Sequence, residues 1–190
     1  MNMSPEMLIK SYLSNIQVNL IIAAHTHCPD DWQDIDYIPD YSKLYYICEG
    51  EGWLKIGDTE IYPKPGQLCL MPAGMTQSYS VINGNTFVKY WCHFTATIGE
   101  VNLFEVMQLP YYIDIPDKTG MDALFSELVK AYDSNRLAAS IKAKSVLLHI
   151  LAYYMDSAAV DGLHLKSTEQ VEKLLEVIRY VDGHLPSAFQ

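Results

Sequence analysis

The fold of this chain is decided by the stretch Gly66–Gln77, which reads GQLCLMPAGMTQ. Its leading glycine accepts the backbone angles of a turn, and Leu68 and Leu70 then alternate onto one face of a short strand. Pro72–Gly74 turns the chain back into a second strand. The stretch therefore predicts two strands joined by a tight turn, with the side chain of Gln77 directed into the interior of a β-structure.

Similar short segments lie on both sides of this stretch, as far as residue 116. They are rich in β-branched and aromatic residues and are separated by turns that contain Gly, Pro or Asn. The predicted strands are Asn19–His27, Ser42–Glu49, Trp53–Ile56, Thr59–Tyr62, Gln67–Met71, Thr76–Ile82 and Thr86–Ala96. Many short strands at close spacing are typical of a β-sandwich or a small barrel.

Beyond Pro116 the apolar residues recur at helical spacing. Helices are predicted over 120–135 and 136–156, and a third is predicted to start at Ser167, where a capping pattern precedes a one-sided apolar stripe. The chain is therefore expected to consist of a β-region, 1–116, a helical region, 117–160, and a last segment, 161–190.

The composition is that of a folded globular protein: 49% of the 190 residues are hydrophobic and 19% are charged. A net charge of −10 disfavours direct binding to a nucleic-acid backbone. The first residues lack the pattern of a signal peptide and no stretch is long enough to span a membrane, so a cytoplasmic location is expected. The cysteines form no C-x-x-C pair and are expected to be buried free thiols: Cys28, Cys48, Cys69 and Cys92.

The spacing G-x5-P-x-G within Gly66–Gln77 resembles the second motif of the cupin superfamily. Cupins carry a metal-binding His where Gln77 stands, and the resemblance places the other metal ligands near Asp36, Ile38 and Lys43. Isoleucine and protonated lysine do not bind a metal ion. The resemblance therefore implies a barrel without a metal site, and no cofactor is predicted.

A longer ordered set of segments makes the resemblance more specific. It comprises Lys43–Ile47, Gly50–Gly52, Gly66–Gln77, Trp91–Phe94 with the sequence WCHF, and the two predicted helices. In this order the segments resemble the N-terminal effector-binding and dimerisation domain of AraC-family transcription regulators. The resemblance implies a mainly β fold: a cupin-like jelly-roll barrel followed by two dimerisation helices and the start of a third.

The resemblance also implies a longer protein. Residues 171–185 resemble the first helix of the family's DNA-binding domain, so the segment 161–190 is expected to hold a linker and the start of a truncated helix-turn-helix domain. DNA would then be contacted only through the missing C-terminal part, and 1–116 would be the effector-binding barrel with an N-terminal arm. The arm, Met1–Ser14, is expected to act as the mobile element of the response.

In family members that sense arabinose the sugar lies inside the barrel, stacked on a tryptophan. By motif, Trp91 and Tyr79 carry this role over to this chain. The alternation of strand side chains adds His93 and Gln77, and cupin geometry directs Lys43 and Tyr45 inward as well. No residue matches the arginine expected in the pocket, so the resemblance implies a saccharide effector without specifying arabinose.

The second predicted helix also suggests a partner. In the family, the helices after the barrel pair between two subunits as an antiparallel coiled coil, which implies a homodimer. The candidate seam residues are Leu137, Ile141, Leu148, Leu151 and Met155. The alternative is that these residues only cover the barrel of their own chain.

Two other functions remain open from the sequence. The first is a stand-alone metal-dependent cupin enzyme, an isomerase or a dioxygenase, which needs at least three convergent ligands. The pair His25 and His27 has the H-x-H spacing of metal ligands, but it lies far upstream of the cupin position and has no evident carboxylate partner. The acidic residues of 30–40 have no calcium-loop spacing and are expected to form a solvated loop. The second alternative is an interaction module whose filled barrel binds nothing. The residues favour the regulator, without catalytic activity.

Overall fold

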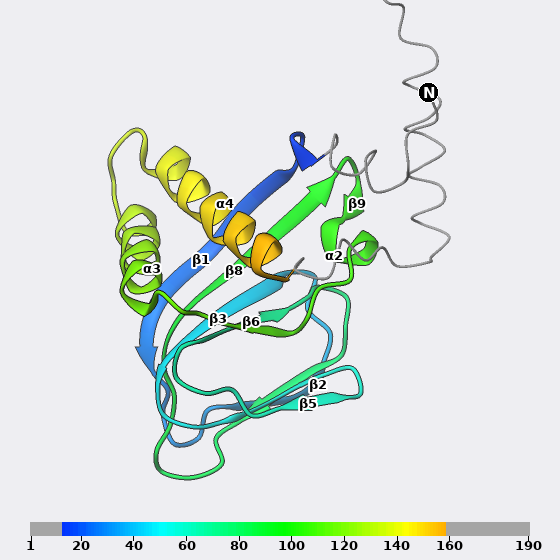
Figure 1. Ribbon diagram of the computed structural model, residues 1–190, viewed down its shortest axis with the longest axis vertical. Helices are drawn as coiled ribbons and strands as arrows, with labels where there is room; N and C mark the ends of the chain where they lie inside the picture. The colour runs from blue at the N-terminus through cyan, green and yellow to red at the C-terminus, as the bar shows by residue number, and fades with distance from the viewer. Residues whose placement is uncertain (1–12, 159–190) are drawn as a thin grey trace, which may run out of the picture.

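The computed structural model describes residues 13–158 as two antiparallel β-sheets with helices packed on one of them (Figure 1). The predicted N-terminal arm lies almost wholly outside the described residues. The predicted helix from Ser167 and the segment 161–190 also lie outside them.

The larger sheet follows the order β1-β8-β3-β6-β10, with β9 paired to β8, and the smaller sheet follows the order β2-β7-β4-β5. The larger sheet consists of β1 (Gln17–His27), β3 (Ser42–Glu49), β6 (Gln67–Met71), β8 (Val88–Ile98), β9 (Val101–Asn102) and β10 (Tyr112–Asp114). The smaller sheet consists of β2 (Gln33–Tyr37), β4 (Trp53–Ile56), β5 (Thr59–Ile61) and β7 (Gln77–Ser80). The helices are α2 (Leu103–Val106), α3 (Lys118–Tyr132) and α4 (Ala139–Ala158). This arrangement confirms the predicted class, mainly β with C-terminal helices.

Turn residues place the strand boundaries where the sequence predicts them. Gly66 has φ of +92°, its amide donates to the carbonyl of Ile47 and its own carbonyl accepts from the amide of Ile115. Gly74 has φ of +75° and its amide donates to the carbonyl of Pro39. At both positions a residue with a Cβ atom would be strained. Local chemistry in the stretch Gly66–Gln77 therefore determines where β6 and β7 lie.

The acidic segment 30–40 was predicted as a loop, and this prediction is wrong over Gln33–Tyr37. These residues form β2, an edge strand that pairs with β7. The ladder shifts register between Asp34 and Tyr37, where Asp36 has a positive φ of 53°. The polar side chains remain exposed as expected, but an edge strand needs only one paired side, so a strongly polar sequence can still form it.

The larger sheet is covered on both faces. Figure 1 shows α3 and α4 lying over β1 and β8, whereas β2 and β5 lie on the opposite side of the molecule. In β3, Ser42–Ile47 is buried without interruption, because one set of alternate side chains faces the helices and the other set faces the smaller sheet. Leu44 and Tyr46 belong to the helix-side core, and Tyr45 and Ile47 belong to the core between the sheets.

The helices begin and end close to their predicted bounds, with one shift that affects the predicted seam. Asp117 caps α3, its side chain accepting from the amide of Gly120. Because α4 starts at Ala139, Leu137 lies in the turn that precedes the helix. None of the helices within 13–158 has an apolar stretch that would cross a lipid bilayer.

Candidate functional site

The core between the sheets contains an unusual concentration of aromatic and polar side chains. On its larger-sheet wall, β3 and β8 pair so that Lys43 lies opposite His93, Tyr45 opposite Trp91 and Ile47 opposite Lys89. Because side chains alternate along a strand, the members of these rows share the face that looks toward the smaller sheet. A sheet interior is normally aliphatic, so this wall is the first candidate for a binding surface.

All six residues predicted for effector binding lie in or beside this interior. Lys43, Tyr45, Trp91 and His93 come from the larger sheet, and Gln77 and Tyr79 come from β7 of the smaller sheet. Lys43, Tyr45 and Gln77 are buried, while Trp91, His93 and Tyr79 are half-buried. The structure thus brings together residues that are up to fifty positions apart in the chain.

Trp91 is held by its polar edge. Its indole Nε1 donates to Thr26 Oγ1 on β1 over 3.0 Å, and its ring centroid lies 4.8 Å from that of His93. The hydrogen bond orients the indole, and the residue as a whole is half-buried.

Gln77 is bound to the turn that precedes it. Its Nε2 donates to the carbonyl of Pro72 over 2.7 Å, and its Oε1 is buried without a hydrogen-bond partner. Gln77, at the position that the cupin resemblance assigns to a metal ligand, therefore stabilises the Pro72–Gly74 turn by a hydrogen bond. One buried acceptor on it remains open.

Lys43 lies in a cage of tyrosines. Its side chain is 1% exposed, and Nζ lies 4.3 Å from the ring centroid of Tyr37, 5.2 Å from that of Tyr79 and 5.7 Å from that of Tyr41. Nζ has no hydrogen-bond partner. Burial lowers the pKa of Lys43 to about 8, although the carboxylate of Asp34 acts in the opposite direction.

Lys89 is a site residue that the sequence analysis did not identify. It is 3% exposed, and its Nζ lies 3.6 Å from the ring of Trp32 and 3.7 Å from that of Tyr45. Burial lowers the pKa of Lys89 to about 7, while the thiol of Cys28 beside it acts in the opposite direction. The signal was present, since strand alternation from Trp91 and His93 puts Lys89 on the same face.

Three aromatic residues of 30–41 were also missed as members of the site. Trp32 stacks on Tyr79 with centroids 4.3 Å apart, Tyr37 meets Tyr79 edge-on at 5.9 Å, and Tyr41 stacks on His93 at 4.5 Å. The sequence placed these residues in or next to a solvated loop. Because β2 pairs with β7, the segment instead folds over the interior.

His93 is neutral at neutral pH. Burial, followed by the nearby Lys43 and Lys89 ammonium groups, lowers the pKa of His93 to about 4. A neutral imidazole both donates and accepts one hydrogen bond, which suits a hydroxyl-bearing ligand.

The candidate metal ligands lie apart from one another in the described part of the chain. Within 13–158 no three His, Cys, Asp or Glu residues come together as a metal site. His25 and His27 are exposed on β1, and the ring of His25 lies against Tyr90 at 4.2 Å. Asp36, one of the aligned cupin positions, accepts a hydrogen bond from Ser78 Oγ.

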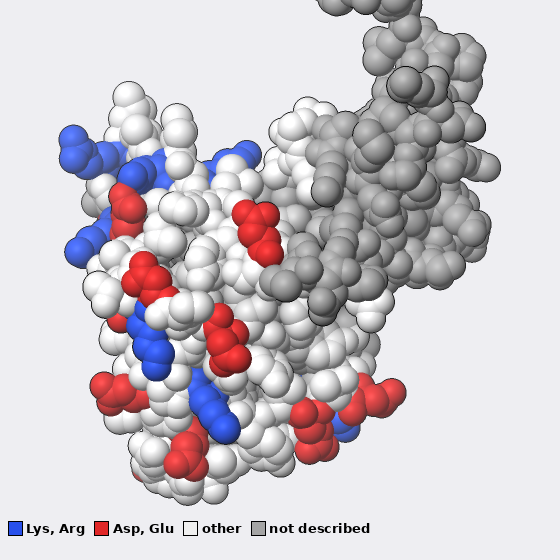
Figure 2. Space-filling model, viewed as in Figure 1, with Lys and Arg blue, Asp and Glu red and all other residues white. Residues whose placement is uncertain are grey.

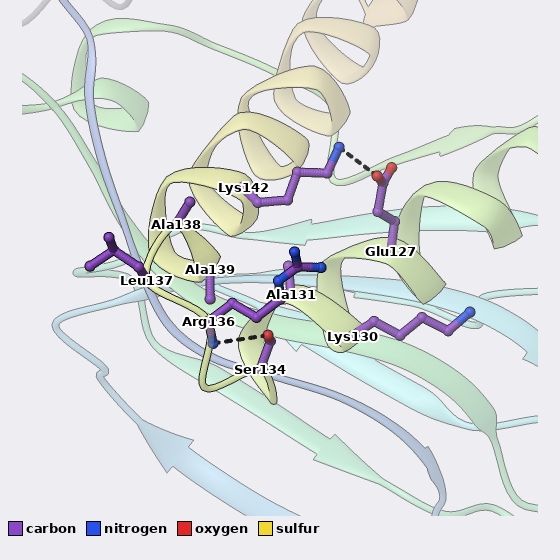
Figure 3. Close-up of a pocket in the computed structure, with 9 residues that line it drawn as sticks. All are labelled: Glu127, Lys130, Ala131, Ser134, Arg136, Leu137, Ala138, Ala139 and Lys142. Carbon is purple, nitrogen blue, oxygen red and sulfur yellow. Dashed lines mark hydrogen bonds and ion pairs between the residues drawn. The ribbon is translucent and has the colours of Figure 1, made fainter.

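The predicted seam residues have different environments. Leu151 is 3% exposed and belongs to the helix-side core, Leu148 and Met155 are half-buried against it, and Leu137 and Ile141 are among the most exposed hydrophobic residues described. Near Leu137, a pocket of about 550 Å³ opens between α3 and α4 (Figure 3).

Basic residues surround this helical corner. Lys130, Arg136 and Lys142 line the pocket, and Lys142 forms an ion pair with Glu127 over 2.6 Å. Figure 2 shows Lys and Arg gathered where α3 meets α4, with an acidic side chain among them, while Asp, Glu and further basic residues are spread over the rest of the visible face. The corner thus combines exposed apolar residues with a positive charge in a protein whose net charge is −10.

Comparison with protein families gives one match, to the family described as AraC-like ligand binding domain, over residues 22–151. Comparison with curated proteins gives no match.

Solved structures show distant likeness only. A Photorhabdus luminescens protein has a TM-score of 0.33 at 14% identity, over 38% of this chain and 59% of that one. A Thermotoga maritima protein described as a predicted oxalate decarboxylase has a TM-score of 0.34 at 21% identity, over 45% of this chain and 71% of that one. The EutQ protein of Clostridium difficile has a TM-score of 0.33 at 14% identity, over 47% of this chain and 69% of that one.

Proposed function

Since the chain belongs to the family of AraC-like ligand-binding domains, we propose that it is the effector-sensing domain of a transcription regulator. It binds a small molecule, a saccharide, between its two sheets, and it pairs with a second copy through its helices. DNA is contacted by a further domain of the regulator. In this proposal the domain senses its ligand and catalyses no reaction.

The observation that carries the proposal is the division of the core between the sheets into two unlike halves. The half built by β4, β5 and β6 is apolar, with Leu54, Ile56 and Ile61 as typical members. The half built by β7, β8 and residues 32–45 carries the aromatic rings, the two lysines and His93. A core selected for stability alone would be apolar throughout, because buried polar groups destabilise a fold unless they are paired.

The residue types of this half suit a saccharide. The C–H face of a sugar ring packs on aromatic faces such as those of Trp91 and Tyr79, and its hydroxyls exchange hydrogen bonds with imidazole, phenol and ammonium groups. Trp91 offers such a face, with its orientation fixed by Thr26.

The mechanism we propose is a population shift. Trp32, Tyr37 and Tyr41 reach the site from the segment that joins β1 to β3, so a ligand that contacts them favours one arrangement of that segment. Because a ligand shifts an equilibrium only by its difference in affinity for the two arrangements, these contacts are the ones that would transmit its presence.

The test is ligand binding by Trp91→Ala against a matched variant. A panel of neutral and acidic sugars, sugar phosphates and oligosaccharides is screened by thermal shift, and the compound that stabilises the protein is titrated. We expect Trp91→Ala to lower the affinity for that compound about tenfold or more, which is equivalent to about 1.4 kcal/mol of binding free energy.

Trp53→Ala is the control, because Trp53 lies in the β4–β5 hairpin and donates to Glu60 away from the interior. Equal affinities of the two variants would contradict binding between the sheets. Iron, manganese or zinc bound in stoichiometric amount to the purified protein would favour the cupin-enzyme alternative.

A further inference from the structure

In the described part of the chain, the interior contains two buried lysines and no buried acidic residue. Among the described residues the buried charged side chains are Lys43 and Lys89, and no Asp or Glu is buried with them. Within 13–158 the ion pair that forms is Lys142 with Glu127 on the surface, so neither buried lysine has a carboxylate within 4.0 Å. Lys43 lowers the pKa of Lys89, both lysines lower the pKa of His93, and these three groups line one wall.

The two ammonium groups border the same pair of stacked rings. Trp32 stacks on Tyr79 at 4.3 Å, Lys89 Nζ lies 3.6 Å from the Trp32 ring, and Lys43 Nζ lies 5.2 Å from the Tyr79 ring. A molecule that entered along this stack would therefore meet both cations.

Contacts with aromatic faces explain the burial of Lys89 better than that of Lys43. A cation over an aromatic face is stabilised, and Lys89 between Trp32 and Tyr45 is well placed for that. Lys43 is less well placed: its rings are farther away and its Nζ has none of the three hydrogen bonds it can donate. A buried ammonium without an acceptor destabilises the fold, and methionine would fill the same space without that cost.

We propose that the molecule sensed between the sheets is an organic anion, and that its carboxylate or phosphate group is bound by Lys43 and Lys89 while the surrounding rings cover its carbon skeleton. This inference rests on the proposed function, because it names the class of the effector for the same site. A neutral sugar would leave both ammonium groups without a counter-charge. An acidic sugar or a sugar phosphate would supply the counter-charge together with hydroxyls for His93.

The test uses matched neutral and anionic probes at constant ionic strength. Glucose is the neutral probe, glucuronate and glucose 6-phosphate carry the two candidate anionic groups on the same skeleton, and acetate and inorganic phosphate supply the bare groups. The melting temperature and the tryptophan fluorescence of the whole chain are followed for the wild type, Lys43→Met, Lys89→Met, the double variant and Lys64→Met. The last is the charge-matched control, because Lys64 is exposed.

We expect at least one anionic probe to raise the melting temperature of the wild type and of Lys64→Met, glucose to leave it unchanged, and the double variant to lose the response. Without any probe, Lys43→Met should melt at or above the wild-type temperature, because it removes a buried ammonium group that has no hydrogen-bond partner. Comparing the change in melting temperature with glucuronate and with glucose 6-phosphate shows whether the site prefers a carboxylate or a phosphate group.

Three outcomes would overturn the inference. If glucose stabilises the wild type and the double variant equally, the effector is neutral and the proposed sensing function stands. If the anions act equally on the double variant, they bind elsewhere. If no probe of either kind changes the wild type, both the inference and the proposed saccharide function fail.

Discussion

His93 shows how neighbouring charges set the state of a single residue. Burial and two ammonium groups lower the pKa of His93 to about 4. The unfolded chain therefore binds more protons than the folded one between that value and the ordinary pKa of His near 6.5, and the free energy of unfolding rises with pH across this window.

We expect His93→Gln to reduce this rise, measured as the urea midpoint from about pH 4 to about pH 7. His25→Gln is the matched control, because the His25 side chain is exposed on β1. If His93→Gln and the wild type keep the same dependence on pH, the pKa of His93 is not lowered in the folded protein.

Gln77 gives a second prediction at the scale of one residue. Its hydrogen bond to the Pro72 carbonyl is buried, so Gln77→Leu leaves that acceptor without a partner. We expect the free energy of unfolding to fall by about 1–2 kcal/mol, measured by urea unfolding.

The hydrogen bond of Gln67 to Asp114 is exposed, so Gln67→Leu should cost less, about 0.5 kcal/mol. A Gln77→Leu protein as stable as the wild type would show that the side chain is free to turn toward a ligand.

At the scale of elements, α4 has two roles that its sequence alone does not separate. Leu151 belongs to the core formed with α3 and the larger sheet, whereas Leu137 lies in the turn before α4 and is fully exposed. Deleting a buried leucine side chain costs its transfer free energy and leaves a cavity.

Leu151→Ala should therefore lower the free energy of unfolding by about 2–5 kcal/mol, and Leu137→Ala should change it by less than about 0.5 kcal/mol. Urea unfolding of the two variants measures the difference. A similar loss in both would mean that Leu137 is also covered in the folded protein in solution.

At the scale of the whole molecule, the exposed and half-buried apolar residues of α4 bear on the proposed dimer. Ile141, Leu148 and Met155 recur at heptad spacing, as a coiled-coil seam requires, and Leu137 precedes them. The corner around Leu137 and Ile141 is positive while the chain carries a net charge of −10, so the acidic surface of a second copy would be attracted to it.

We expect sedimentation of the wild type to show a dimer at tens of micromolar, and the pair Leu137→Glu with Ile141→Glu to give a folded monomer. Both side chains are exposed, so the pair should leave the melting temperature of the monomer nearly unchanged. A wild type that sediments as a monomer would contradict dimerisation through the helices.

The sequence by itself determined the elements whose signals are local. Glycines with positive φ and prolines mark the turns around β6 and β7, and alternation within β3 and β8 predicts which side chains face inward, including Lys43, Tyr45, Trp91 and His93. These signals require only neighbours in the chain, so they are readable without the fold.

Only the tertiary structure decided the chemistry of the interior. The sequence of residues 32–41 indicates a polar loop, but in the structure β2 pairs with β7. That pairing places the Trp32 ring against Lys89 and the Tyr37 ring against Lys43. Within the described residues Lys43 Nζ has no hydrogen-bond partner and neither lysine is paired with a carboxylate, and both facts depend on long-range packing. Local sequence specifies which side chains face the core, whereas charge and burial arise from segments that meet only when the sheets close over one another.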